Sequence, residues 1–234
     1  MTANEILDEL KSYGNETTRR TWINHGAGES CFGVKIEHMK KIQKRIKVDH
    51  KLALELYDSG ISDVMYFAGL IADDPKMTKK DLQRWVEKAK WGMVAQYTVP
   101  WVASGSPHGR ELAMKWIDSK KELIALAGWA TYSSMVSVKP DEELDLPEVK
   151  KLLERVEKTI HDAPNKVRYV MNGFVIAVGS YVKPLSDAAS KVAKRIGVVS
   201  VDMPGDCKVP FAPDYIEKAK ARGTLTKKRK MAKC

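Results

Sequence analysis

The feature that most restricts the fold is a succession of short helical segments with clear start and stop residues across residues 2–197. The run Thr2–Glu5 is a capping box, which opens a helix, and Gly14 stops that helix. Ile36–Ile46 places apolar side chains at the three- and four-residue spacing of an amphipathic helix. No alternating, strand-like run is longer than Val198–Val201. The chain is therefore predicted to be all-α.

Short turns without heptads join these segments, which is typical of stacked antiparallel helix pairs. An acid–leucine–tryptophan pattern also recurs about thirty residues apart, at Asp81 and Glu111. Helical pairs with such a period form α-solenoids. We predict an α-α superhelix of antiparallel pairs in a single domain, residues 1–200, followed by a basic C-terminal extension, residues 201–234. The expected helices cover residues 3–13, 17–24, 36–46, 51–58, 61–72, 110–117, 122–136, 149–160, 165–181 and 186–196, with two more within 81–104.

Cysteine and histidine usage argues against a structural metal. Cys31, Cys207 and Cys234 are far apart and form no CxxC pair, and the five histidines form no ligand pattern. This usage is typical of a reduced compartment, and no signal peptide is indicated. We expect a cytoplasmic monomer without metal or cofactor. The longest apolar run, Phe174–Val178, is too short to span a bilayer, so no membrane is expected as a partner.

The net charge of +10 is unevenly distributed. Residues 218–234 carry eight positive charges and no acid, which leaves 32 basic and 30 acidic residues elsewhere. Lys35–Lys51 carries seven more cations against Glu37 and Asp49. Each cluster alone is also consistent with a solvated helix face or a frayed tail, but together they fit a polyanion such as nucleic acid.

Two groups of residues are predicted to contact phosphate. The first is Lys40, Lys44 and Lys47 on the basic helix. The second is Asn165, Lys166 and Arg168, at the start of helix 165–181, where free backbone N–H groups would add to the attraction.

The stretch Asp81–Ser104 contains three of the six tryptophans. Trp85 and Trp101 have apolar neighbours and are expected in the core. Trp91 precedes Gly92, which leaves room beside the indole, so Trp91 either lines a pocket or serves packing.

Several stretches, in the same order, resemble the DNA alkylation repair family of HEAT-like repeat proteins, which are alkylpurine DNA glycosylases. They are Phe32-Gly33-Val34, Lys90-Trp91 through Val99-Pro100, Trp116-Ile117-x-Ser119, Asn172-Gly173-Phe174-Val175 and Pro184-Leu185-Ser186. The resemblance covers roughly residues 15–197 and implies that the helix pairs are HEAT-like repeats. The implied partner is duplex DNA, alkylated or structurally deformed.

The resemblance also implies a chemistry. An N3- or N7-alkylated purine is cationic, and breaking its glycosidic bond builds oxocarbenium character that a carboxylate can stabilise. Aromatic rings hold the cationic nucleotide by cation–π contact. The family supplies one ring and the carboxylate from a Trp-x-x-x-Asp element, and a second tryptophan and an arginine complete the site.

Carried over residue by residue, this site is incomplete. Trp91 matches the first tryptophan, but the aspartate position falls on Ala95, and the neighbouring Gln96 can only orient water. The arginine position falls near Leu126, with Trp129 one turn on, and the second tryptophan becomes Phe174. One extra residue is needed between positions 91 and 100, and no carboxylate occurs from 92 to 109.

Three hypotheses follow. The first is a DNA-binding HEAT-like protein with weak or no base excision. The second is an active glycosylase that uses Glu87 as its carboxylate, although the position of Glu87 favours an exposed partner of Lys90 or Lys88. The third is a protein-binding α-solenoid scaffold.

Overall fold

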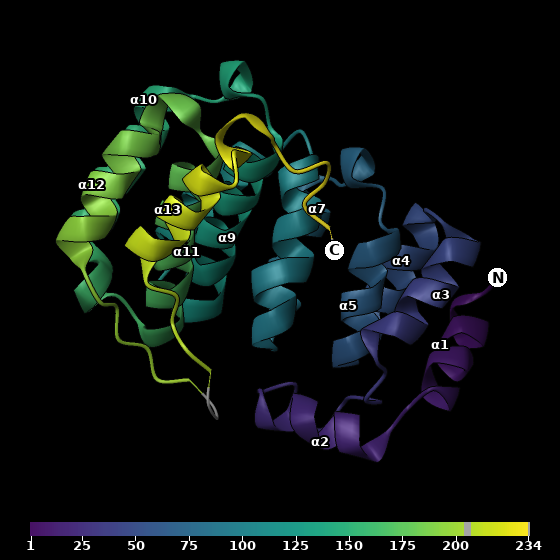
Figure 1. Ribbon diagram of the computed structural model, residues 1–234. Coiled ribbons are helices and arrows are strands. Elements are labelled where there is room, and N and C mark those ends of the chain that lie inside the picture. The colour runs from purple at the N-terminus through teal and green to yellow at the C-terminus, as the bar shows by residue number, and fades with distance from the viewer. Residues whose placement is uncertain (204–206, 234) are drawn as a thin grey trace. The chain divides into compact units, whose positions relative to one another are not determined.

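The computed structural model describes residues 1–203 and 207–233, which form helices joined by short loops, without a strand among them (Figure 1). The all-α class is therefore confirmed. The α-helices are α1 Ala3–Ser12, α2 Glu16–Asn24, α3 Ile36–Ile46, α4 His50–Asp58, α5 Ser62–Ile71, α6 Lys79–Lys88, α7 Val99–Gly105, α8 Gly109–Ile117, α9 Glu122–Val138, α10 Leu146–Thr159, α11 Asn165–Tyr181, α12 Ser186–Ile196 and α13 Ala212–Ala221. A π-helical segment, Val94–Thr98, leads into α7.

The described residues form two compact units, residues 1–108 with Lys233, and residues 109–232. In the first unit, α5 is the central element, and α3, α4 and α7 pack against it. Every residue of α5 is buried, as expected for a helix that is apolar on nearly all sides. Gly69 allows close approach, because a Cβ there would lie 2.4 Å from the Thr98 side chain. Trp85 and Trp101 are buried as predicted.

In the second unit, α9 packs between α8 and α11, and α12 packs against α10 and α11. Gly128 brings α9 against α8, since a Cβ at that position would lie 2.5 Å from the Ile117 backbone nitrogen. The helix α13, yellow in Figure 1, packs against α11 and α12. Its Ile216 is fully buried against Gly179 of α11.

The predicted bounds of α3, α11 and α12 coincide with those observed. The extension beyond residue 200 is more ordered than a frayed tail, because it contains α13 and a short 3-10 turn at Thr224–Thr226. Its last part is also anchored: Lys228 Nζ donates to the Val136 carbonyl and pairs with Asp141 at 2.7 Å. The predicted single domain at 1–200 stays a prediction. None of the helices in residues 1–203 and 207–233 has the length and hydropathy needed to cross a membrane.

Candidate nucleic-acid interface

The first unit contains a cavity of about 460 Å³ beside Trp91. The loop after α2 forms one side of it, and the ends of α4 and α6 form the others. Gly26 and Gly28 of this loop, and Gly60 after α4, have positive φ and open space where a Cβ would lie. The backbone itself therefore borders the cavity at these residues. The lining residues are Gly26, Ala27, Gly28, Glu29, Ser30, Asp58, Gly60, Ser62, Met65, Glu87, Lys88, Lys90 and Trp91.

Trp91 is held firmly in the wall of this cavity. Only 1% of it is exposed, and its Nε1 donates to the His25 carbonyl at 3.1 Å. The Trp22 ring meets it edge-on, with centroids 4.7 Å apart. Trp91 therefore both packs and lines a pocket, so the two expectations for it are compatible.

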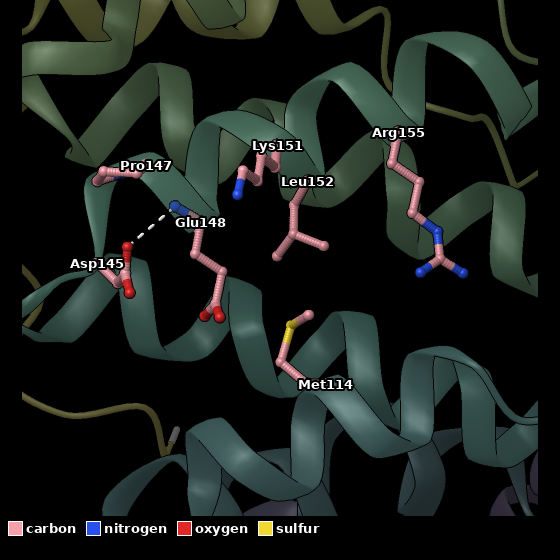
Figure 2. A pocket seen from close by; sticks show the side chains of 7 residues that line it. All are labelled: Met114, Asp145, Pro147, Glu148, Lys151, Leu152 and Arg155. Atoms are coloured by element: carbon pink, nitrogen blue, oxygen red, sulfur yellow. Dashed lines mark hydrogen bonds between the residues drawn. The ribbon is translucent and has the colours of Figure 1, made fainter.

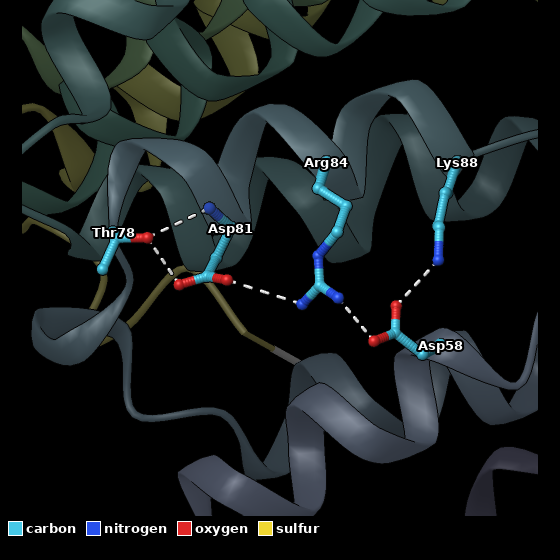
Figure 3. A network of polar contacts seen from close by, with 5 residues as sticks. All are labelled: Asp58, Thr78, Asp81, Arg84 and Lys88. Atoms are coloured by element: carbon cyan, nitrogen blue, oxygen red, sulfur yellow. Dashed lines mark hydrogen bonds and ion pairs between the residues drawn. The ribbon is translucent and has the colours of Figure 1, made fainter.

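Two residues that line the cavity, Asp58 and Lys88, belong to a network of polar contacts (Figure 3). Asp58 accepts hydrogen bonds from Lys88 Nζ, at 2.9 Å, and from Arg84, which also reaches Asp81. Partial burial raises the pKa of the Asp58 carboxyl, but the hydrogen bonds and charges of these two cations outweigh it and hold the net pKa below its ordinary value. Thr78 fixes Asp81 from the other side, as the N-cap of α6. The network fixes α6 against the end of α4.

Glu87 lines the same cavity as Trp91. Its carboxylate accepts from Gln83 Nε2 at 2.8 Å, whereas Lys88 donates to Asp58. Lys88 therefore pairs with the carboxylate on α4, and Glu87 is oriented by a neutral partner on its own helix.

Ala95, the residue that we expect to match the family's aspartate, is fully buried and lies in the π-helical segment. There the Val99 N–H donates to the Val94 carbonyl, five residues back, so one turn contains an extra residue. The segment lies within positions 91–100, where we expect one extra residue relative to the family, and that expectation stays a prediction. Gln96 is half-buried, and its side chain donates to the Tyr97 hydroxyl at 3.2 Å.

Trp129 and Phe174 lie together in the core of the second unit, between α9 and α11. Their ring centroids are 5.3 Å apart, and both side chains are buried. The Arg155 guanidinium lies 5.8 Å from the Trp129 ring centroid and pairs with Asp118 at 2.6 Å. Leu126, near the family's arginine position, is buried. Arg155 of α10 therefore places a cation beside the Trp129 ring, and the sequence alone did not identify this residue.

The basic helix α3 presents its lysines outward. Met39 and Ile42 face the core, while Lys44 and Lys47 are exposed and Lys40 is half-buried. Among the residues that the structure describes, none of these three lysines has an ion-pair partner. Their charges are consequently available to an external anion.

The start of α11 is more occupied than the sequence suggested. Asn165 exchanges two hydrogen bonds with the Asp202 backbone, and Arg168 donates to the carbonyls of Ala163 and Ser200. The Lys166 N–H donates to Glu122 Oε1 at 2.8 Å, while the Lys166 side chain is exposed. Asn165 and Arg168 therefore anchor residues 200–202, and Lys166 keeps a free side chain.

A second cavity, of about 440 Å³, lies between α8 and α10 and was not anticipated (Figure 2). Met114 and Leu152 face each other across it, and Glu148 borders its polar end. Glu148 receives a hydrogen bond from Arg110 Nε at 2.8 Å and another from the Tyr132 hydroxyl. The Arg110 hydrogen bond holds the pKa of Glu148 below its ordinary value.

Comparison with solved structures identifies the fold class of the chain. The chain matches a solved structure over 100% of both chains, with 36% identity and a TM-score of 0.92. That structure is described as "a new family of proteins related to the HEAT-like repeat DNA glycosylases with affinity for branched DNA structures". The predicted HEAT-like fold class is thereby confirmed.

Residues 6–191 match the family model described as DNA alkylation repair enzyme, and the chain belongs to that family. Two relatives of similar length are the uncharacterized proteins Lin0241 of Listeria innocua, 35% identical, and Lmo0209 of Listeria monocytogenes, 34% identical. Each alignment covers 95% of this chain and 99% of the relative.

Proposed function

We propose that this protein binds branched DNA through its HEAT-like fold and excises alkylated bases weakly or not at all. The observation that carries the proposal is the full-length match to a protein with affinity for branched DNA structures. Because a 36% identical chain with this TM-score shares the course of the backbone, the binding surface is expected to be shared too.

The chemistry of the site supports the second half of the proposal. The position of the family's aspartate holds a fully buried alanine. A methyl group can neither stabilise an oxocarbenium ion nor activate water. The two positions that we expect to match the family's tryptophans keep aromatic rings, Trp91 and Phe174, and Trp129 lies beside Phe174; all three side chains are buried. These residues, together with Gln96, would act by positioning rather than by bond cleavage.

The proposed phosphate contacts are Lys40 and Lys44 of α3 and Lys47 at its C-cap, with Lys166 as a further candidate. Fluorescence anisotropy should measure affinity for a four-way junction and for a duplex of the same sequence, from 50 mM to 200 mM salt. Replacing Lys40, Lys44 and Lys47 by Gln should reduce the salt slope by about three units, one for each lysine. The matched control replaces three exposed lysines of α10 and α12, Lys150, Lys158 and Lys194, by Gln and should leave the slope unchanged. Absence of binding to both DNAs would refute DNA binding and favour the protein-scaffold hypothesis, and binding that does not weaken with salt would refute the proposed phosphate contacts.

The second candidate function is an active alkylpurine glycosylase that uses Glu87. One observation favours it: Glu87 and Trp91 line the same cavity, which has the size of a small-ligand site. Single-turnover release of N3- and N7-methylated purines from alkylated duplex DNA tests it. Release that is abolished in both Trp91→Ala and Glu87→Gln would establish this candidate, whereas release unaffected by Glu87→Gln would exclude it.

A further inference from the structure

The helix α13 has two different faces. One face carries Ala212 and Ile216, which are buried. The other carries Phe211, Tyr215, Lys218 and Arg222, at spacings of four, three and four residues, which places them in one stripe along the helix. All four side chains of this stripe, here called the α13 stripe, are exposed.

The aromatic content of the α13 stripe is unusual for a solvated surface. Phe211 is 42% exposed and Tyr215 is 51% exposed, although such side chains usually bury their rings. The helix does not need them for its own packing, because the buried face already seats it on α11. Two rings one turn apart therefore form an unfilled apolar platform.

The charge of the α13 stripe is positive. Lys218 Nζ lies 5.5 Å from the Tyr215 ring centroid, and in the described part of the chain neither Lys218 nor Arg222 has an ion-pair partner. The other cation of the helix, Lys220, is already paired with Asp187 and Glu217. Apart from the paired Glu217, the only acid in α13 is Asp214, so the two cations of the stripe outnumber it.

The platform is also rigidly mounted. A Cβ at Gly179 would lie 2.6 to 3.0 Å from three atoms of Ile216, so α13 sits directly on the α11 backbone. The fully buried Asn172 side chain donates to the Pro210 carbonyl at 2.8 Å, which fixes the residue just before Phe211. A fixed platform loses little conformational entropy when a ligand binds.

We propose that the α13 stripe binds unpaired nucleotides of branched nucleic acid. Tyr215 and Phe211 stack on exposed bases, while Lys218 and Arg222 contact the flanking phosphates. Stacking on aromatic rings beside free cations is how single-stranded nucleic acid is held without sequence preference, because every base presents a flat π-face. An uncharged apolar protein partner would leave the two cations unmatched. The proposal rests on the proposed function, since it names the part of the branched DNA that this surface takes.

The test compares two variants on a four-way junction with four unpaired thymines at the branch point. The double variant Phe211→Ser/Tyr215→Ser should bind this junction about 5- to 20-fold more weakly and bind a perfect duplex within twofold of the original chain. The control, Tyr13→Ser, removes an exposed ring from the other unit and should change neither affinity. Because Phe211 and Tyr215 are exposed, thermal unfolding should be nearly unchanged in the double variant, which separates lost contact from lost fold.

A second measurement locates the contact. Replacing one unpaired thymine by 5-iodouracil and irradiating the complex should give a cross-link that peptide mass spectrometry assigns to Tyr215 or Phe211. Equal junction affinity of the double variant and the original chain, or a cross-link confined to residues outside α13, would overturn the inference while leaving the proposed function intact. Failure of the original chain to bind any of these DNAs would overturn both.

Discussion

Substituting Gly179 by Ala tests directly whether α13 is part of the folded core. The added Cβ would lie 2.6 Å from Ile216 Cδ1, 2.7 Å from Cγ1 and 3.0 Å from Cγ2. A shift of one flexible methyl group cannot relieve all three contacts, so α13 has to move. Overpacking of this kind costs about 1–3 kcal/mol. Replacing glycine in a helix interior returns about 1 kcal/mol of helix propensity. We therefore expect a net loss of up to about 2 kcal/mol.

The matched control is Gly173→Ala on the same helix, where the added Cβ meets no atom within 4 Å. That variant gains the propensity without the clash and should be stabilised by about 0.5–1 kcal/mol. Urea unfolding should thus place the midpoint of Gly173→Ala above that of the original chain and the midpoint of Gly179→Ala below it. Equal stabilisation by both substitutions would show that α13 is not seated on Gly179. Ile216→Ala should destabilise the Gly179→Ala variant less than it destabilises the original chain, because the two side chains compete for one space.

Three further predictions concern the rest of the fold. Gly128→Ala would place a Cβ 2.5 Å from the Ile117 backbone nitrogen, and should cost at least about 2 kcal/mol in urea unfolding, because a backbone atom cannot yield as a side chain can. Asp63 is fully buried and accepts hydrogen bonds from the backbone N–H groups of Phe32, at 3.2 Å, and Val34, at 2.9 Å. Asp63→Ala should lower the free energy of unfolding by about 3 kcal/mol, and Asp63→Asn, which keeps an acceptor oxygen, should lower it less in the same assay. Burial raises the pKa of Asp74 to about 6, although the positive charge of Lys233 acts to lower it. Between about pH 4 and pH 6, the folded chain therefore keeps a proton on Asp74 that the unfolded chain has released. The contribution of Asp74 to stability should therefore fall as pH rises from about 4 to 6, and Asp74→Asn should flatten that part of the measured profile.

Local signals in the sequence were sufficient to locate most helices. The capping residues Thr2, Asp49 and Thr78 each precede a helix start and accept a hydrogen bond from its first turn, as their side chains predict. Gly197 was expected to stop the helix that became α12, and it is the C-cap residue of that helix. These features depend on residues within one or two turns of each other, which is why they can be read without a structure.

The features that escaped prediction depend on residues far apart in the chain. A proline at the second position of α13 and Asp214 in its first turn are helix-start signals, but the basic composition that follows suggested a frayed tail. The contact that orders α13, between Gly179 and Ile216, joins residues in separate helices. Likewise, Trp91 is fixed by the His25 carbonyl and the Trp22 ring, and no local pattern links them.

The π-helical segment contains Ala95 and Gln96, the two residues on which the family's aspartate position could fall. Its geometry therefore matters for the expectation that a catalytic carboxylate is absent. An extra residue in one turn shifts the side chains only until the turn ends. After it, α7 continues with Trp101 and Val102 buried, so the downstream core is in place. Counting four residues from Trp91 places the aspartate position on Ala95, whose N–H makes an ordinary helical hydrogen bond to the Trp91 carbonyl at 3.0 Å. If the extra residue lies before that position, the aspartate position falls on Gln96. Neither side chain carries a charge. For either placement of the extra residue, the position that we expect to match the family's aspartate carries no charge. This supports the proposal of DNA binding without efficient base excision.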